Sequence, residues 1–237
     1  MSARVSQRLN EGIVGPTFYT LAEINAAINE GLRLFVLLTL GVEKTAAWNV
    51  PAFGANGSVP FFHMLQYFTD WIVPLRITTA AGAKVRPARL EDLASLDGAW
   101  WNSPGAPSRY AALGADFLAL YQQPASAGTT LQVTYARAPL PLLLPTDVPE
   151  IPGVYHPRLV DYGIYRCRQV EGGQEFAKSL VYLASFLDGA THYGRFVRAR
   201  NLGSRYDKLP FELEAFDKSQ MLKLGRAGMT VRTPTGE

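Results

Sequence analysis

The side chains best suited to metal binding are few and widely spaced. His63, His156 and His192 are the three histidines, and none stands in an H-x-x-x-H or H-E-x-x-H pattern, which places two ligands on one helical face. Cys167 is the single cysteine, which excludes an intrachain disulfide and a multi-cysteine zinc site. We therefore predict no metal centre and no cofactor, and we expect Cys167 to be a small buried side chain within a helix.

Motifs for nucleophilic catalysis and nucleotide binding are also missing from the sequence. No serine stands in a G-x-S-x-G elbow. Gly172 and Gly173 follow no predicted strand and precede no lysine, so they form neither a P-loop nor a dinucleotide fingerprint. Glu91 and Asp92 are adjacent carboxylates, which a helix would point in different directions. The sequence therefore predicts no catalytic residue and no enzymatic activity.

Two adjacent tryptophans form the most distinctive local motif. Trp100 and Trp101 precede the loop N-S-P-G-A-P-S-R-Y, and such rings can stack on a nucleobase or a sugar. The favoured interpretation is that one ring caps a sheet core, because no basic cluster interleaves the pair. A small monomeric ligand-binding module or hydrolase that uses the Trp100-Trp101 loop stays open as the alternative function.

The formal net charge is only +3, but basic residues become more frequent in the C-terminal half. Four of them lie in or just after the last predicted helix: Arg195, Arg198, Arg200 and Arg205. They can meet phosphate groups or an acidic protein surface, and a solvated helix face is the other interpretation.

The apolar segments of the sequence indicate the cellular compartment, because none of them fits a signal peptide or a membrane-spanning helix. The N-terminal sequence M-S-A-R-V-S-Q-R-L-N lacks the apolar core of a signal peptide. The longest apolar run, residues 34–42, is much shorter than the ~20 residues that cross a bilayer. We therefore expect a soluble protein, made in a reducing cytoplasm, that makes no contact with a membrane.

Apolar residues recur at helical spacing in three segments, which predicts helices over residues 20–38, 155–170 and 174–201. Thr20 and Glu23 have the spacing of a capping box at the start of the first helix. Five residues form the apolar stripe of the third: Phe176, Leu180, Leu183, Ala184 and Leu187.

Between the first and second of these helices the apolar period changes to two, which is typical of strands. The predicted strands are residues 71–77, 84–86, 109–113, 116–121 and 130–137. Leu131, Val133 and Tyr135 face one side of the last strand. Residues 89–96 predict a short helix, and residues 49–60 a loop.

Residues 138–152 contain five prolines and can be neither a regular helix nor a central strand. The segment is too apolar for a free linker, so we expect it to lie over the core. The whole pattern predicts an α+β fold: a helix bundle, made of the N-terminal helix and the C-terminal helix pair, with an inserted antiparallel β-meander of four to five short strands within residues 61–152.

Residues 1–203 form the predicted core, and residues 204–237 form a C-terminal extension. The extension has no periodic apolar face, yet it contains too many apolar groups for a purely solvated terminus. Such segments often become buried against a partner. Five of its residues are the partner-contact candidates: Phe211, Leu213, Phe216, Met221 and Leu224.

The order of several short segments carries a family resemblance over about residues 20–200. They are T-L-A-E-I-N-A-A-I-N-E in the first helix, D-W-I-V-P-L-R-I, G-A-P-S-R-Y, F-L-A-L-Y, L-Q-V-T-Y, and D-V-P-E-I-P-G-V-Y-H before the helix pair. This arrangement resembles the head-to-tail adaptor proteins of tailed bacteriophages, also called head completion or tail tubular proteins.

The resemblance implies a non-enzymatic virion protein at the head–tail interface, assembled in the host cytoplasm. It implies a ring, usually of twelve copies, that docks under the portal protein and joins it to the next tail component, such as a nozzle, tail terminator or stopper. Double-stranded DNA would pass non-specifically through the channel. Arg195, Arg198, Arg200 and Arg205 are the DNA-channel candidates, with salt bridges to neighbouring subunits as the alternative.

Overall fold

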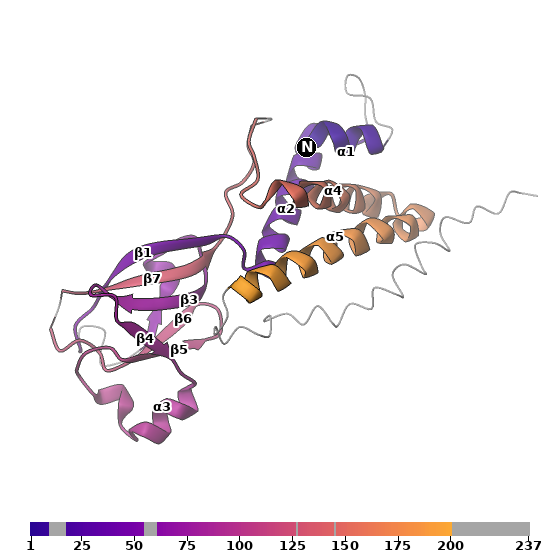
Figure 1. Ribbon diagram of the computed structural model, residues 1–237. Helices are drawn as coiled ribbons and strands as arrows, with labels where there is room; N and C mark the ends of the chain where they lie inside the picture. The colour runs from indigo at the N-terminus through magenta and orange to yellow at the C-terminus, as the bar shows by residue number, and fades with distance from the viewer. Residues whose placement is uncertain (10–17, 55–60, 127, 145, 201–237) are drawn as a thin grey trace, which may run out of the picture. The chain divides into compact units, whose positions relative to one another are not determined.

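The computed structural model describes residues 1–9, 18–54, 61–126, 128–144 and 146–200 (Figure 1). It shows a mixed α+β chain with five α-helices and a curled seven-stranded sheet within these residues. The chain divides into two compact units, a helical unit within Met1–Gly41 and Pro139–Glu237 and a β unit of Val42–Ala138. The sequence had predicted an inserted β region of residues 61–152.

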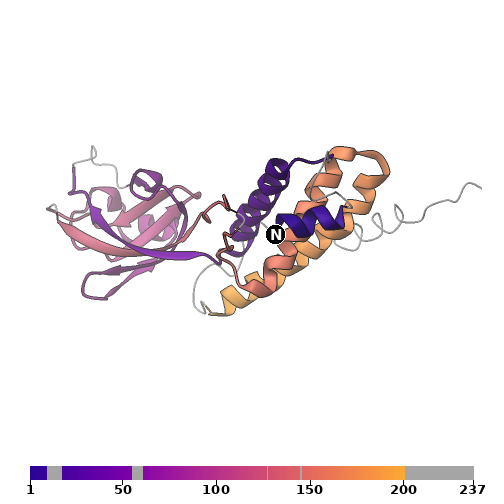
Figure 2. The ribbon, with the colours of Figure 1, turned by 90° about the horizontal axis from the view of Figure 1, so that it is seen from above.

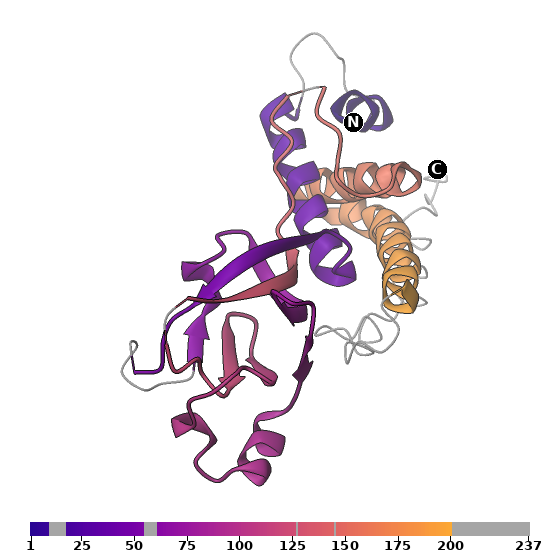
Figure 3. The same ribbon diagram turned by 60° about the vertical axis from the view of Figure 1, so that its left-hand side comes forward.

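The described part of the helical unit contains four helices: α1 (Ser2–Arg8), α2 (Leu21–Thr39), α4 (His156–Glu171) and α5 (Gly173–Arg200). The last three lie where helices were predicted, whereas α1 was not foreseen. α2, α4 and α5 contact one another, and α1 lies against α2 and α4 (Figure 3).

Local sequence explains where these helices begin and end. The Thr20 Oγ1 accepts a hydrogen bond from the Glu23 backbone N–H at 3.2 Å, and the Thr20 N–H donates to Glu23 Oε2 at 2.8 Å, which completes the predicted capping box. Between α4 and α5, Gly172 and Gly173 have φ angles of 71° and 53°, a region that glycine adopts at no steric cost.

The apolar stripe predicted for α5 is only partly buried. Phe176 is 40% exposed and Leu183 is half-buried, while Phe186 is completely buried. The ring of Phe186 packs against Phe35 of α2 and Tyr162 of α4, with ring centroids 5.8 and 4.8 Å apart. These ring contacts therefore decide which face of α5 is buried, and helical spacing alone does not reveal them.

The described part of the β unit holds seven strands in the order β1-β7-β3-β4-β5-β6-β2, curled around an apolar interior (Figure 2). The strands are β1 (Glu43–Val50), β2 (Phe61–His63), β3 (Trp71–Thr79), β4 (Lys84–Pro87), β5 (Arg109–Leu113), β6 (Phe117–Tyr121) and β7 (Thr129–Arg137). Helix α3 (Leu90–Leu96) and a 3-10 turn (Trp100–Asn102) connect β4 to β5. Leu131, Val133 and Tyr135 all face the interior, as predicted.

The sheet differs from the predicted meander of four to five antiparallel strands in two respects. It has seven strands, because β1 and β2 were not predicted, and β4 pairs with β5 in parallel. β1 reads E-K-T-A-A-W-N-V, and its alanines lack the branched or aromatic side chains that mark a strand. It is a strand because it pairs with β7 over its whole length. The parallel pair is possible because the α3 crossover returns the chain in the same direction.

Candidate assembly interface

The residues that could have carried chemistry are engaged separately by local partners. The ring of His63 lies 5.0 Å from that of Phe117. His156 Nε2 is 2.9 Å from the Ile151 carbonyl oxygen, and His192 Nδ1 is 2.7 Å from the Tyr155 hydroxyl. Within the part of the chain that the structure describes, no group of three or more His, Cys, Asp or Glu side chains is placed to hold a metal ion.

Cys167 is a buried side chain of α4, which confirms its predicted place. Trp100 is also buried, in a cluster with Leu93, and its ring meets that of Phe61 edge to face at 5.9 Å. Trp101 is half exposed. Since one ring of the pair belongs to the core, the two tryptophans do not form a shared stacking platform.

The proline-rich segment after β7 carries several of the most exposed large apolar side chains among the described residues. The prediction that it lies over the core is wrong for most of its apolar residues, although Pro139, Pro149 and Ile151 are buried. We call its four exposed leucine and valine residues the apolar crest: Leu140, Leu143, Leu144 and Val148, which are 64–77% exposed.

Two polar side chains hold the crest in one shape. Asn29 of α2 exchanges two hydrogen bonds with the backbone of Leu142, of 3.0 and 2.7 Å. Asp147 Oδ2 accepts from the backbone N–H groups of Leu143 and Leu144, both at 2.7 Å. Side chains thus satisfy backbone groups that have no sheet or helix partner, and the leucine side chains are left pointing outward.

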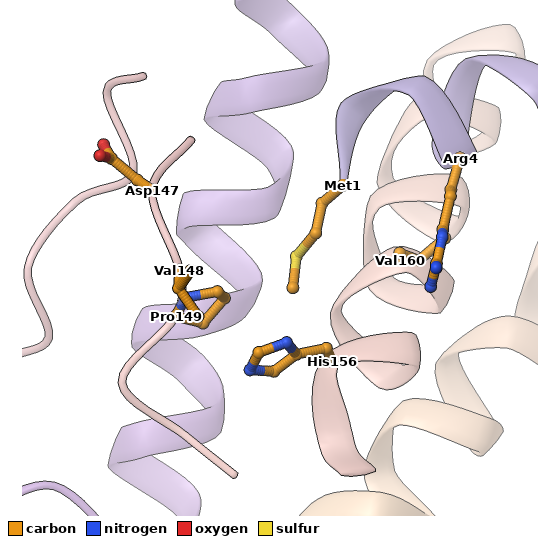
Figure 4. A pocket seen from close by; sticks show the side chains of 7 residues that line it. All are labelled: Met1, Arg4, Asp147, Val148, Pro149, His156 and Val160. Carbon is orange, nitrogen blue, oxygen red and sulfur yellow. The ribbon is translucent and has the colours of Figure 1, made fainter. Parts of the chain in front are cut away.

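A shallow recess of about 250 Å³ adjoins the crest (Figure 4). Met1 and Arg4 of α1, Asp147, Val148 and Pro149 of the proline segment, and His156 and Val160 of α4 line it. Figure 4 shows the Met1 side chain extending from α1 toward the ring of His156. The recess is smaller than ordinary small-molecule pockets, which hold about 300–1,000 Å³.

A buried carboxylate keeps the recess in shape. Asp161 of α4 accepts a 2.8 Å hydrogen bond from Arg8 of α1 through one oxygen, and a 2.7 Å bond from Ser185 of α5 through the other. Arg158 lies 3.7 Å from the second oxygen and also donates to Ser185. These contacts tie α1, α4 and α5 together, so that both helical walls of the recess are fixed.

A second carboxylate joins α2 to α4. Glu30 accepts hydrogen bonds from the Tyr162 hydroxyl at 2.9 Å and from the Arg166 guanidinium at 3.0 Å. Burial and the hydrogen bond to Glu30 raise the pKa of Tyr162, so its phenol stays protonated over the ordinary pH range. The polar contacts of the helical unit are thus contacts between helices rather than a reactive cluster.

The predicted DNA-channel residues are described only in part. Arg195 is exposed and Arg198 is half-buried, both on α5. The side chain of Arg200 and all of Arg205 lie outside the described residues. So do all five partner-contact candidates: Phe211, Leu213, Phe216, Met221 and Leu224.

The sequence interpretation overlooked three further arginines in the β unit. Arg76, Arg86 and Arg109 each stand next to a residue that faces the interior, namely Ile77, Val85 and Tyr110. This alternation was the available signal for outward-facing cations, but their proximity depends on strand pairing that no local pattern shows.

An exposed apolar crest whose backbone is fixed by side-chain hydrogen bonds is typical of a protein that assembles with other proteins. The model of the SU10 adaptor protein family matches residues 1–207. The chain therefore belongs to this family of phage head-to-tail adaptors, which marks it as a structural component of the phage particle. No curated protein matches the chain. None of the described helices has the length and apolar character needed to span a bilayer.

Proposed function

We propose that the chain forms the adaptor ring of the virion, docks under the portal protein and joins it to the next tail component. The ring has twelve copies, and double-stranded DNA passes through its channel. This role needs neither catalysis nor a cofactor, and assembly takes place in the host cytoplasm. The family match supports the role, and the apolar crest is the observation on this chain that carries it.

The geometry of the crest favours the portal as its partner over a neighbouring copy. In a ring of identical copies, each contact joins two different complementary patches, one on each neighbouring copy. The crest and the recess instead lie side by side: Val148 belongs to both, and its neighbours Asp147 and Pro149 also line the recess. They form one continuous surface, which suits a single partner that covers both.

Two other parts of the chain complete the proposal. Arg195, Arg198, Arg200 and Arg205 contribute positive charge to the channel, where each cation is repeated around the ring axis. The extension of residues 204–237 contacts a neighbouring subunit, the portal or the next tail component through its apolar residues.

The portal complex of the double variant L143D/L144D tests the assignment of the crest. Because both leucines are already 77% and 64% exposed, the variant should keep the wild-type melting temperature. Two buried charges at the interface should weaken portal binding at least about tenfold, as measured by sedimentation of the mixture.

L96D is the control, since Leu96 is 51% exposed on α3 in the β unit. It should bind the portal as the wild type does. Wild-type portal affinity of L143D/L144D would show that the crest is not the portal contact.

A further inference from the structure

Strand pairing brings three arginines of the β unit into one row. Arg86 of β4 pairs directly with Arg109 of β5. Arg76 of β3 lies one residue beyond the pair Ile77–Val85, which places it beside Arg86. Neighbouring strands are about 4.8 Å apart, so the row spans about 10 Å across three strands. We call Arg76, Arg86 and Arg109 the arginine row.

The row faces away from the interior of the β unit. Ile77, Val85 and Tyr110, each next to one of the arginines, all point into the apolar core. Alternation along a strand therefore puts the arginines on the outer face. Arg76 and Arg86 are exposed, and Arg109 is half-buried.

The arginine row has no ion-pair partner among the described residues. None of its three guanidinium groups forms an ion pair or a side-chain hydrogen bond with another described side chain. Lys84, two residues before Arg86, adds a further exposed cation on the same face. Like charges on adjacent strands destabilise a sheet, so the fold itself gains nothing from this arrangement.

The surroundings of the row fit phosphate better than a protein surface. Thr134 pairs with Arg76, and Thr45 lies beyond it with the two hydroxyl oxygens 2.9 Å apart. Arginine and threonine side chains are common donors to DNA phosphates. The centre of a protein interface is apolar, whereas no large exposed apolar side chain of the described chain belongs to β3, β4 or β5.

We infer that the arginine row binds the phosphate backbone of double-stranded DNA without reading its base sequence. The inference rests on the proposed function, which supplies the DNA as the polyanion near the ring. It adds a binding surface on the β unit to the arginines proposed on α5.

The test is a titration of a short labelled DNA duplex of mixed sequence with the full chain, followed by fluorescence anisotropy at several salt concentrations. Each phosphate contact contributes about 0.9 to the slope of log affinity against log salt. R76Q/R86Q should therefore reduce that slope by about 1.8. Between about 50 and 200 mM salt, the wild type should lose about tenfold more affinity than the variant.

R4Q/R33Q is the matched control, because it removes the same charge from exposed arginines of α1 and α2. The control should keep the wild-type slope. An equal decrease in both double variants would mean diffuse attraction by net charge and would overturn the inference, as would a wild type that does not bind the duplex at low salt.

A third contrary result identifies another partner. If R76Q/R86Q keeps the wild-type slope but no longer joins the portal or neighbouring copies, the row binds an acidic protein surface instead of DNA. The titration uses the free chain, so its outcome is independent of ring formation and is distinguishable from a failure of the crest experiment.

Discussion

The interhelical carboxylates of the helical unit and the arginine row of the β unit differ in whether they have partners within the chain. In the helical unit, Asp161 and Glu30 each hold partners from other helices, and Arg8 reaches across 153 residues of sequence to Asp161. In the β unit, Arg76, Arg86 and Arg109 form a row without a described ion-pair partner. The contrast shows which charges maintain the fold and which are left for a binding partner.

The exposed apolar groups differ between the units as well. The helical unit presents the apolar crest, whose backbone is fixed by Asn29 and Asp147. The β unit buries most of its large rings, including Trp48 and Phe62, whose centroids are 5.0 Å apart. The helical unit thus offers an apolar surface for protein contact, and the β unit offers a cationic one.

Cavities in the two cores should have the largest effect on the free energy of unfolding. Each cavity should mainly affect the unit that contains it. Phe186→Ala and Trp48→Ala each remove a completely buried ring and should cost about 3–5 kcal/mol. Hydrogen exchange should show the loss of protection mainly in α2, α4 and α5 for the first variant and mainly in the strands for the second. Equal loss throughout the chain from either change would contradict the division into two units.

A smaller effect should come from crowding the contact between α2 and α4. A Cβ on Gly31 would lie 2.6 Å from the Tyr162 ring, which its hydrogen bond to Glu30 holds in place. Gly31→Ala should therefore destabilise the chain by about 1–3 kcal/mol in denaturant unfolding. Gly194→Ala on α5 is the control, because its Cβ meets only ordinary contacts at 3.7 Å or more. It should raise stability by up to about 1 kcal/mol.

Acid should reveal how much Asp70, which accepts hydrogen bonds from two side chains, stabilises the β unit. Burial tends to raise the pKa of Asp70, but hydrogen bonds from Tyr135 and Lys44, at 2.7 and 2.9 Å, bring it below its ordinary value. A lowered pKa in the folded state gives stability that is fully present above the unfolded value of about 3.9 and is lost as pH falls below it.

Asp70→Asn should reduce this loss of stability in acid. At neutral pH it should lower the free energy of unfolding by about 1 kcal/mol. Melting curves recorded between neutral pH and pH ~3 measure both effects. If the variant loses as much stability in acid as the wild type does, other carboxylates cause the acid sensitivity.

The smallest effect on stability should come from the arginine row, and it should be a gain rather than a loss. Arg86→Gln removes the central charge and relieves repulsion from both neighbours, so it should raise stability by about 0.2–1 kcal/mol. The gain should shrink in high salt, which screens exposed charges. A clear loss of stability would show that Arg86 has a structural partner and would weaken the contrast between the units.

Periodicity predicted the elements whose environment is regular. Helical spacing located α2, α4 and α5, and alternation identified Leu131, Val133 and Tyr135 as interior residues. Periodicity failed where contacts between distant parts of the sequence determine the structure. β1 depends on pairing with β7, which lies far along the chain, and the place of Phe186 depends on Phe35 and Tyr162.

The candidate surfaces were the least predictable part. An apolar run between prolines is usually buried, but the crest is turned outward because Asn29, 113 residues from Leu142, takes up its backbone hydrogen bonds. The arginine row requires the register of three strands, including a parallel pair that follows a crossover. Alternation marks the arginines as outward-facing, but neither the outward turn of the crest nor the proximity of the three arginines has a local sequence signal.

Electron microscopy of the chain mixed with its own portal tests the central claim most directly. The account predicts that negatively stained portal particles gain one additional ring at one end, with the rotational symmetry of the twelve proposed copies. Portal particles that stay unchanged beside free monomers of the chain would contradict it.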